Sequence, residues 1–341
     1  MTGPAGSLAA AIQSGLSGSR LPGLTAGVQR LMAAYRSGEV PDAPVMASRA
    51  DAAAYAAYRM PATAAATAFA LREMSLSLPG WAPGSVLDFG GGTGGASWAA
   101  ADELTSIAEV TLLEQSAEAI ALGQAILAAS DSAALRAASW RTWRLPAGDL
   151  AGAGVFPDAD LAVSGYLLGE LTAQQQAQLV GLAAAAAPAV LLVEPGTPAG
   201  HRRILAARSQ LLESGFRVAA PCPHELGCPL EVPGDWCHFG VRLQRSAVHR
   251  QAKGAELSYE DEKFSYVAAV RSGRAGPELP PGRIVRRPQQ RKGLVLLEVC
   301  ASDGTCGREL VSKSKGDFYK AARKASWGDR FTGPGGENHS A

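Results

Sequence analysis

The chain has 341 residues, of which 47% are hydrophobic, 18% charged and 6% aromatic. This composition excludes a disordered chain and a disulfide-rich miniprotein, and the length fits two modest domains or one domain with additions. The net charge of +1, taken alone, argues against a strongly charged partner such as nucleic acid. However, residues 1–200 contain nine Arg, no Lys and 16 acidic residues, whereas residues 201–341 contain 23 basic and 15 acidic residues. The two halves therefore carry opposite charge, and all five cysteines lie in the basic half.

No segment of the sequence predicts targeting or membrane insertion. The first basic residue is Arg20, and residues 1–20 are rich in Gly, Ala and Ser without a compact apolar core. We therefore expect a cytoplasmic protein, or an organellar one if the source is eukaryotic. The most apolar window, Leu179–Val193, has 15 residues and contains Pro188, which is too short and too interrupted for a bilayer span. In a reducing cytosol the cysteines are expected to be metal ligands or free thiols rather than disulfides.

In chain order, the pattern first predicts helices and then an alternation of strands and helices. The expected helices near the N-terminus are Leu24–Arg36, Asp51–Tyr58 and Thr63–Met74. From Ser85 onward, Ala-rich helices alternate with apolar strands at Val86–Phe89, Val110–Glu114, Leu161–Ser164 and Ala189–Glu194. Such alternation is typical of an α/β fold, a parallel sheet with helices on both faces. A helix at His201–Ser214 and strands at Phe239–Leu243, Phe264–Val270 and Leu294–Val299 follow.

These elements divide the chain into four predicted parts. An N-terminal helical region (1–75) precedes the α/β domain (76–272), which contains a cysteine-rich loop at 221–238. After a Pro-rich linker, Pro277–Pro281, we expect a small basic β-rich part (273–330) and a disordered tail (331–341).

Alternating glycines follow the first strand of the α/β domain. The strand ends in an acidic residue and opens into a D-x-G-x-G-x-G pattern formed by Asp88, Gly90, Gly92 and Gly94. Glycines there let the backbone turn sharply and approach a ligand where a Cβ atom would clash. The next strand ends at Glu114, 26 residues after Asp88, where a carboxylate can accept hydrogen bonds from both hydroxyls of a ribose. The pattern predicts a nucleotide site.

Two ligand classes compete for this loop. A dinucleotide fold places a pyrophosphate on the helix N-terminus and usually shows G-x-G-x-x-G. Here the carboxylate of Asp88 would repel a pyrophosphate but suits the ammonium group of an amino-acid ligand. The segment therefore resembles the class I S-adenosylmethionine-dependent methyltransferases, in which the first loop holds the methionine part and the second acidic residue holds the ribose. By that resemblance we expect Asp149 at the adenine edge.

The groups for a methyl-transfer reaction are not defined by the sequence. Methyltransferases that act on exocyclic amines usually show an Asn-Pro-Pro-Tyr type motif after the fourth strand, whereas this chain has Ser164–Glu170 there. Tyr166, Glu170 and Glu194 are expected at the pocket mouth, at the carboxyl ends of strands, and are the candidates for catalysis. No catalytic base is assigned among them.

Three cysteines lie within 16 residues of a Pro/Gly-rich loop: Cys222, Cys228 and Cys237. Thiolates select zinc or iron–sulfur clusters among biological metals. The C-x5-C-x8-C spacing lacks the C-x2-C knuckle of structural zinc sites, and two of the thiols precede proline, a context also seen at cluster ligands.

A fourth ligand must come from a distant part of the chain. We favour Cys300, at the end of an apolar strand, over Cys306 in the following turn, because a strand end fixes a thiolate better than a Gly-rich turn. His224 and His238 are alternative ligands if the metal is zinc.

Several stretches together resemble one family across roughly residues 45–330. They are Tyr58–Thr63, the glycine loop, Pro221–His224, Asp235–Phe239, Tyr259–Tyr266 and Ala325–Asp329. On these segments the chain resembles the ribosomal small-subunit methyltransferase-like family, which has mitochondrial members. The resemblance implies a class I methyltransferase fold, association with the small ribosomal subunit during assembly, and a 4Fe-4S cluster. Carried onto this sequence, the cluster ligands are Cys222, Cys228, Cys237 and Cys300.

Basic residues are concentrated near the C-terminus. The candidates for RNA contact are Arg283, Arg286, Arg287, Arg291, Lys292, Lys313, Lys315, Lys320, Arg323 and Lys324. Clustered Lys and Arg bind phosphates, and aromatic residues such as Phe318 and Tyr319 between them can stack on exposed bases. The cluster predicts an RNA-binding surface despite the nearly neutral net charge.

Two functions remain open at this point. The first is an S-adenosylmethionine-binding, iron–sulfur-containing protein that is monomeric when free and acts on the small ribosomal subunit and its rRNA, as methyltransferase or assembly factor. The second is a small-molecule methyltransferase with a structural zinc site. A radical enzyme is disfavoured, because its cluster normally uses a tight C-x3-C-x2-C loop that leaves one iron open.

Overall fold

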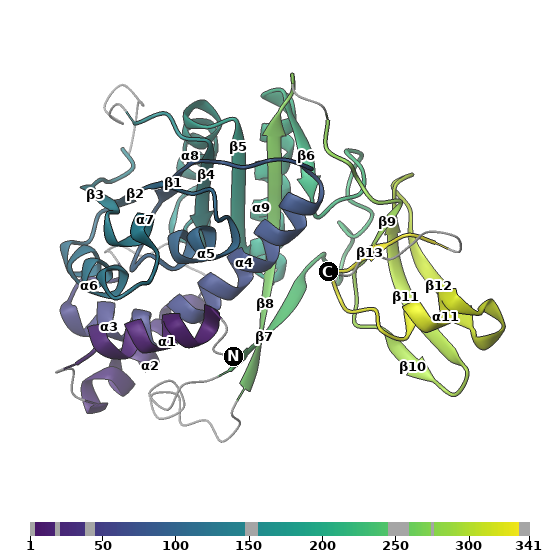
Figure 1. The fold of residues 1–341 in the computed structure, drawn as a ribbon, viewed down its shortest axis with the longest axis horizontal. Coiled ribbons are helices and arrows are strands. Elements are labelled where there is room, and N and C mark those ends of the chain that lie inside the picture. Colours follow the sequence, from purple (N-terminus) through teal and green to yellow (C-terminus); the bar gives the residue numbers. More distant parts are fainter. Residues whose placement is uncertain are drawn as a thin grey trace.

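The N-terminal region is helical, and it packs against the larger of two β-sheets (Figure 1). The computed structural model describes residues 4–17, 21–37, 45–146, 156–244, 259–273 and 276–333. The first helices are α1 (Pro4–Gly15), α2 (Leu21–Ser37), α3 (Arg49–Tyr58) and α4 (Met60–Leu76). The Ser48 side chain caps α3 by accepting a hydrogen bond from the Asp51 N–H, and Pro61 lies in the first turn of α4, where its missing N–H costs nothing.

The larger sheet has strand order β3-β2-β1-β4-β5-β8-β6, with β7 paired to β8. Its strands are β1 (Ser85–Phe89), β2 (Glu109–Glu114), β3 (Ser139–Thr142), β4 (Leu161–Gly165), β5 (Ala189–Pro195), β6 (Phe216–Ala220), β7 (Phe239–Gln244) and β8 (Tyr259–Arg271). Strands β1 to β5 are parallel, and β8 runs antiparallel to β5, β6 and β7. The sequence order reverses between β2-β1 and β4-β5, which is where open α/β sheets bind their ligands.

Helices cover both faces of this sheet and create two cores. The helices are α5 (Gly95–Glu103), α6 (Ala117–Ala128), α7 (Ala133–Arg136), α8 (Ala173–Ala186) and α9 (Pro198–Glu213). Alternate residues of β1 point to opposite faces: Val86 joins the core formed with α4 and α5, whereas Leu87 and Phe89 join the core formed with α8 and α9. The predicted α/β class is confirmed.

The smaller sheet lies beside the larger one, at the right of Figure 1, and is antiparallel. It consists of β9 (Gly282–Ile284), β10 (Gln289–Arg291), β11 (Leu294–Ala301), β12 (Cys306–Ser312) and β13 (Arg330–Phe331), with α11 (Asp317–Ala322) packed against it. Its core contains Ile284, Val295, Leu297 and Val311. Phe331 pairs with Gly282, so ordered structure continues past residue 330, where the sequence predicted a disordered tail.

Two strands of the larger sheet were not predicted. Strand β3 has a mostly exposed burial pattern, so it lacks the apolar run that marked its neighbours. Strand β6 follows α9 after a single turn at Gly215, whose φ is +81°. In the described part of the chain, no helix is long and apolar enough to cross a bilayer.

Candidate functional site

The glycine loop leaves the carboxyl end of β1 in a conformation that few other residues adopt. Gly90, Gly92 and Gly94 have φ values of +68°, +56° and +92°. A Cβ atom on Gly90 would lie 2.6 Å from the Leu167 side chain, whereas one on Gly92 would lie 3.5 Å from the Tyr55 ring, on the open side of the loop. Gly94 is the N-cap of α5. The backbone of this loop is therefore free to approach a ligand.

Glu114, at the end of β2, is hydrogen-bonded both to the glycine loop and to the segment that follows β2. Its Oε2 accepts a hydrogen bond from the Gly92 N–H at 2.9 Å, and its Oε1 accepts one from the Ser116 N–H at 2.8 Å. Each carboxylate oxygen has a second lone pair, so the group can still accept hydrogen bonds from a diol. Burial raises the pKa of Glu114 above its usual range.

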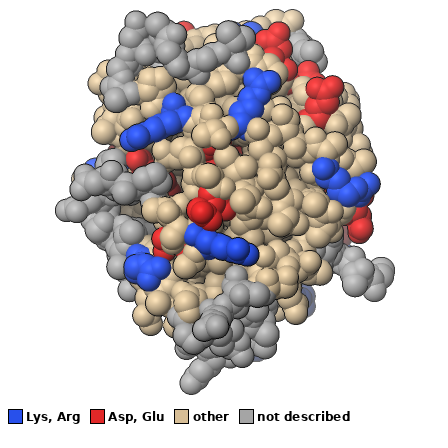
Figure 2. Space-filling view, turned by 90° about the vertical axis from the view of Figure 1, so that its left-hand side faces the viewer, with Lys and Arg blue, Asp and Glu red and all other residues tan. Residues whose placement is uncertain are grey.

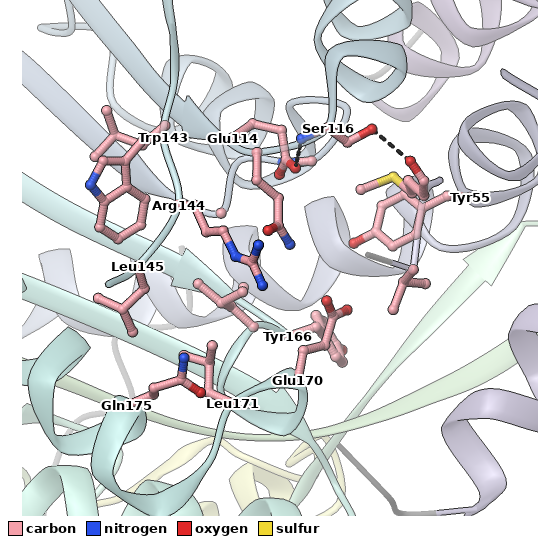
Figure 3. A pocket seen from close by; sticks show the side chains of 18 residues that line it. Tyr55, Glu114, Ser116, Trp143, Arg144, Leu145, Tyr166, Glu170, Leu171 and Gln175 are labelled. Atoms are coloured by element: carbon pink, nitrogen blue, oxygen red, sulfur yellow. Dashed lines mark hydrogen bonds between the residues drawn. The ribbon is translucent and has the colours of Figure 1, made fainter. Parts of the chain in front are cut away.

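A cavity of about 160 Å³ opens between these elements (Figure 3). It is lined by residues that follow β1, β2, β3 and β4, that is, by the carboxyl ends of the four parallel strands next to the reversal. The guanidinium of Arg144 extends into the cavity from the segment after β3 (Figure 3). Met46 and Tyr55, from the N-terminal region, close another side, and the Met46 carbonyl accepts a hydrogen bond from the Ser116 hydroxyl at 2.6 Å. We call this the nucleotide cavity.

Asp88 lies beneath the loop, in a smaller adjoining cavity that Thr63 and Gly165 also line. It is 1% exposed; its Oδ2 accepts hydrogen bonds from the N–H and hydroxyl of Ser97, and its Oδ1 has no partner in the described structure. The Thr63 hydroxyl is also buried without a partner. Burial raises the pKa of Asp88 to about 7. A cationic ligand group placed here would supply the missing partner.

The three catalytic candidates do not share one environment. Tyr166 and Glu170 line the nucleotide cavity, but Glu194 does not. Glu194 is fully buried and forms an ion pair with Arg203 at 2.7 Å, so its expected place at the pocket mouth is wrong. The hydroxyl of Tyr166, a residue with φ of +63°, donates to Glu262 at 2.8 Å, and burial raises the pKa of Tyr166 well above its usual value. Tyr166 is therefore no base at neutral pH.

Asp149, expected at the adenine edge, lies outside the described residues. Trp143, Arg144 and Leu145 lie on the wall of the nucleotide cavity, and they were not predicted as site residues from the sequence. The two tryptophans and Leu145 within residues 139–145 were the available signal, although they do not alternate strictly with polar residues.

A second cavity is lined by four of the five cysteines, and we call it the cysteine cavity. Cys222 and Cys228 come from the loop after β6, Cys237 precedes β7, and Cys300 lies on β11 of the smaller sheet. Cys306 faces Cys300 across the β11–β12 pair but is not among the residues that line the cavity. The cavity thus lies where the two sheets meet.

Burial governs the protonation of the groups around this cavity. It raises the pKa of the Cys237 thiol well above its usual value, with further contributions from Cys222, Cys228 and Cys300, and it raises the pKa of Cys300 to about 12. The Nε2 atom of His224 lies 3.4 Å from the Cys300 Sγ. In the described residues, no three His, Cys, Asp or Glu side chains converge on one point as ligands of a single ion.

The histidines beside the cysteine cavity stay neutral near pH 7. Burial lowers the pKa of His201 to about 4, and it lowers the pKa of His224 and of His238. The Nδ1–H of His238 donates to the Trp236 carbonyl at 3.1 Å, and His238 does not line the cavity.

The predicted RNA-contact residues fall into distinct groups. Arg283 is 1% exposed and forms a buried ion pair with Glu73. It cannot reach an RNA phosphate, so its predicted role in RNA contact is wrong. Arg286, Arg287 and Lys320 are ion-paired with Asp235, Asp261 and Asp317 respectively. In the described part of the chain, six predicted residues are exposed and form no ion pair: Arg291, Lys292, Lys313, Lys315, Arg323 and Lys324.

These six residues lie at one end of the smaller sheet, and we call them the basic patch. The Lys313 N–H donates to the Gly293 carbonyl at 2.9 Å, which sets η3 (Lys313–Lys315) against the β10–β11 turn. The Gln290 side chain donates to the Arg323 carbonyl at 2.8 Å. Phe318 and Tyr319 are not free to stack on bases as expected, because both pack against the core of the smaller sheet, Phe318 on Phe331.

The opposite end of the molecule has no comparable concentration of charge. Figure 2 shows the side that is on the left in Figure 1; among the residues drawn in colour there, basic and acidic side chains are few and interspersed. Because every Lys lies at or after residue 253, the basic side chains of residues 1–200 are all Arg.

The strand order, the antiparallel β8 and the glycine loop at the carboxyl end of β1 define a class I methyltransferase fold of the Rossmann-like type. Residues 49–332 match the family described as mitochondrial small ribosomal subunit Rsm22. The chain belongs to this family, as the resemblance in the sequence predicted.

Relatives with assigned names share part of their length with this chain. A human protein, ribosome assembly protein METTL17, mitochondrial, is 29% identical over 295 residues, which cover 81% of this chain and 61% of the human one. Rsm22-cox11 tandem protein 2, mitochondrial, from Schizosaccharomyces pombe, is 28% identical over 181 residues, 42% of this chain and 24% of the relative. The chain thus spans less than two thirds of either relative.

Solved structures with a similar fold include methyltransferases of different substrates. The match to the ribosomal protein L11 methylase from Lactobacillus delbrueckii subsp. bulgaricus covers 61% of this chain and 79% of the methylase chain, with 14% identity and a TM-score of 0.35. The match to the glycopeptide N-methyltransferase MtfA complexed with S-adenosyl-L-methionine covers 61% of this chain and 95% of the MtfA chain, with 15% identity and a TM-score of 0.37. The fold assignment rests on the topology described above.

The expected cytoplasmic location is wrong. The matching family is described as mitochondrial, and so are the human and fission-yeast relatives. The composition of residues 1–20 therefore did not predict the cellular compartment correctly.

Proposed function

We propose that this protein binds S-adenosylmethionine and an iron–sulfur cluster and acts on the small ribosomal subunit as an assembly factor or rRNA methyltransferase. The observation that carries the proposal is the family match over residues 49–332, which includes the glycine loop, the four cysteines of the cysteine cavity and the basic patch. The named relatives are a ribosome assembly protein and Rsm22 tandem proteins, all mitochondrial.

The nucleotide cavity supports S-adenosylmethionine as the ligand. Asp88 offers an unpartnered carboxylate oxygen where the ammonium group of the methionine part would lie, and Glu114 offers lone pairs to the ribose hydroxyls. The glycine loop leaves room for the backbone to approach the ligand between them. When bound, the cofactor would supply an electrophilic methyl group. The residues of this chain bind and orient it, and no residue is assigned as the base.

The cysteine cavity supports a thiolate-ligated metal site. Four thiols from three separate segments face one buried space, and burial raises the pKa of three of them, Cys228, Cys237 and Cys300. Cys222, Cys228, Cys237 and Cys300 would hold the cluster. A cluster joins thiolates that are further apart than the ligands of one ion, which fits four cysteines that do not already converge on a point.

Substitution of single cysteines tests the metal assignment. Changing Cys222, Cys228, Cys237 or Cys300 to Ser should abolish the brown colour and the iron and sulfide content of anaerobically purified protein, because each removes one of four ligands. Cys306→Ser is the matched control and should retain both, since Cys306 is not part of the cavity wall. A colourless wild-type protein with stoichiometric zinc would refute the cluster, and iron loss in Cys306→Ser alone would refute the choice of Cys300.

A further inference from the structure

A buried arginine without a carboxylate partner faces the cysteine cavity. Arg208, on α9, is 5% exposed and lines this cavity. One of its terminal nitrogens, Nη2, donates to the carbonyls of His224 and Leu226, each at 3.0 Å. Its Nε atom is buried and has no hydrogen-bond partner in the described structure. The guanidinium is thus held in place by the cysteine-rich loop, with one donor left unused.

Two other arginines nearby, the partly exposed Arg203 and the buried Arg283, have counter-ions. Arg203, on the same helix, forms an ion pair with Glu194 at 2.7 Å. Arg283, which also lines the cysteine cavity, is paired with Glu73. In the described part of the chain no Asp or Glu forms an ion pair with Arg208. A buried charge without a counter-ion is unfavourable, because burial removes its hydration and nothing replaces it.

The groups that can supply the missing negative charge are the cysteines. Arg208 lines the same buried cavity as Cys222, Cys228, Cys237 and Cys300. Neutral thiols do not compensate a positive charge. Four thiolates around a 4Fe-4S core of charge 2+ carry a net charge of −2, and one further electron makes the site more negative. Among the groups that the structure describes around Arg208, the loaded cysteine site would therefore be its counter-ion.

We propose that Arg208 is the built-in counter-ion of the metal-loaded cysteine site and raises the reduction potential of its cluster. This inference rests on the proposed iron–sulfur cluster. A fixed positive charge beside the cluster favours the state with one more electron, and a hydrogen bond from the unused Nε donor to a sulfur would act in the same direction. The same charge favours an all-thiolate ligand set over a neutral set of two thiolates and two histidines.

Uncharged and charged replacements of Arg208 test this role in the full chain, purified without oxygen. The wild type, Arg208→Gln, Arg208→Met and Arg208→Lys are titrated with dithionite while electron paramagnetic resonance follows the reduced cluster. The reduction potential should be lower in Arg208→Gln and Arg208→Met, and close to the wild-type value in Arg208→Lys. Arg202→Gln is the control, because Arg202 is exposed on the same helix, and it should leave the potential unchanged.

The potential separates this role from a purely structural one. If Arg208 only held the loop carbonyls of His224 and Leu226, its variants would lower the melting temperature but would keep the wild-type potential. An unchanged potential in Arg208→Gln or Arg208→Met with wild-type iron content overturns the counter-ion role and leaves the cluster itself standing. A wild-type protein that holds no iron overturns both.

Discussion

At the scale of single residues, Asp88 links cofactor binding to pH. Its carboxylate is buried, Ser97 supplies its hydrogen bonds on one oxygen only, and burial raises its pKa to about 7 from 3.8. The folded protein therefore holds a proton on Asp88 that the unfolded chain releases. The contribution of this group to stability is present at acidic pH and is lost as the pH rises from about 4 to about 7.

Affinity for S-adenosylmethionine should rise with pH, because its ammonium group favours ionised Asp88. We expect roughly tenfold weaker binding at pH 6 than at pH 7.5, measured by calorimetry. Asp88→Asn should bind weakly at both pH values, yet its cofactor-free form should melt at a higher temperature at pH 8 because a buried charge is gone. Equal affinity of the wild-type protein at the two pH values would contradict the assignment of the ammonium to Asp88.

Gly92 tests the geometry of the loop. A Cβ atom on Gly92, whose φ is +56°, would lie 3.5 Å from Met46 and Tyr55, which both line the nucleotide cavity. Gly92→Val therefore both strains the backbone and fills ligand space, so cofactor binding should be lost. Gly215→Val is the matched control: its φ is +81°, it has open space around it, and it lies away from the cavity. Both variants should lose about 1–3 kcal/mol of stability, but only Gly92→Val should lose calorimetric binding.

At the scale of elements, the basic patch combines the β10–β11 turn, η3 and the two basic residues that follow α11. Its residues are exposed and form no ion pair with any residue that the structure describes, so each can contact an RNA phosphate directly. Arg286, Arg287 and Lys320 must first leave a carboxylate. The patch lies on the smaller sheet, and the cysteine cavity joins that sheet to the larger one. A metal bound in the cysteine cavity, as proposed above, would therefore influence the position of the patch relative to the nucleotide cavity.

Neutralising four residues of the patch should weaken RNA binding and its dependence on salt. For the combined change of Arg291, Lys292, Lys313 and Lys315 to Gln, we expect the slope of log affinity against log salt to fall by about 3. The control carries the same charge change on the acidic half, with Gln at Arg30, Arg72, Arg136 and Arg141. Fluorescence anisotropy with an rRNA fragment measures both, and equal slopes for the two variants would argue against the patch.

At the scale of the whole molecule, a few contacts between distant segments hold the two sheets together. Arg283 of β9 pairs with Glu73 of α4 and donates to the Pro221 carbonyl at 2.9 Å, and Arg330 donates to the Ser77 hydroxyl at 2.6 Å. These contacts bring α4, the cysteine-rich loop and the smaller sheet into one unit. The opposite charges of the two halves of the sequence thus meet partly inside the protein.

Glu73→Ala should destabilise the protein strongly, because it leaves the Arg283 guanidinium buried without its counter-ion. We expect a loss of about 3–5 kcal/mol in the free energy of unfolding, measured with urea. Glu103→Ala breaks the Arg72–Glu103 pair, in which the Arg72 side chain is 51% exposed, and should cost about 1 kcal/mol or less. Similar losses in the two variants would mean that Arg283 is not held as a buried pair.

Local patterns and long-range contacts differ in how far the sequence predicts them. The apolar run of β1 followed by alternating glycines identified the loop, because both signals lie within ten residues. The burial of Arg283 could not be predicted, since its partner Glu73 is 210 residues away and a lone arginine in a basic stretch indicates a surface. The same holds for Glu194, which meets Arg203 only once α9 packs on β5.

The most direct test of the proposed function is crosslinking of the protein to RNA in cells, followed by sequencing of the bound RNA. The proposal predicts reads concentrated at a few positions of the small-subunit rRNA, and their loss when Arg291, Lys292, Lys313 and Lys315 of the basic patch are changed to Gln. Reads spread over unrelated RNAs, or a small-subunit signal that the patch variant retains in full, would contradict it.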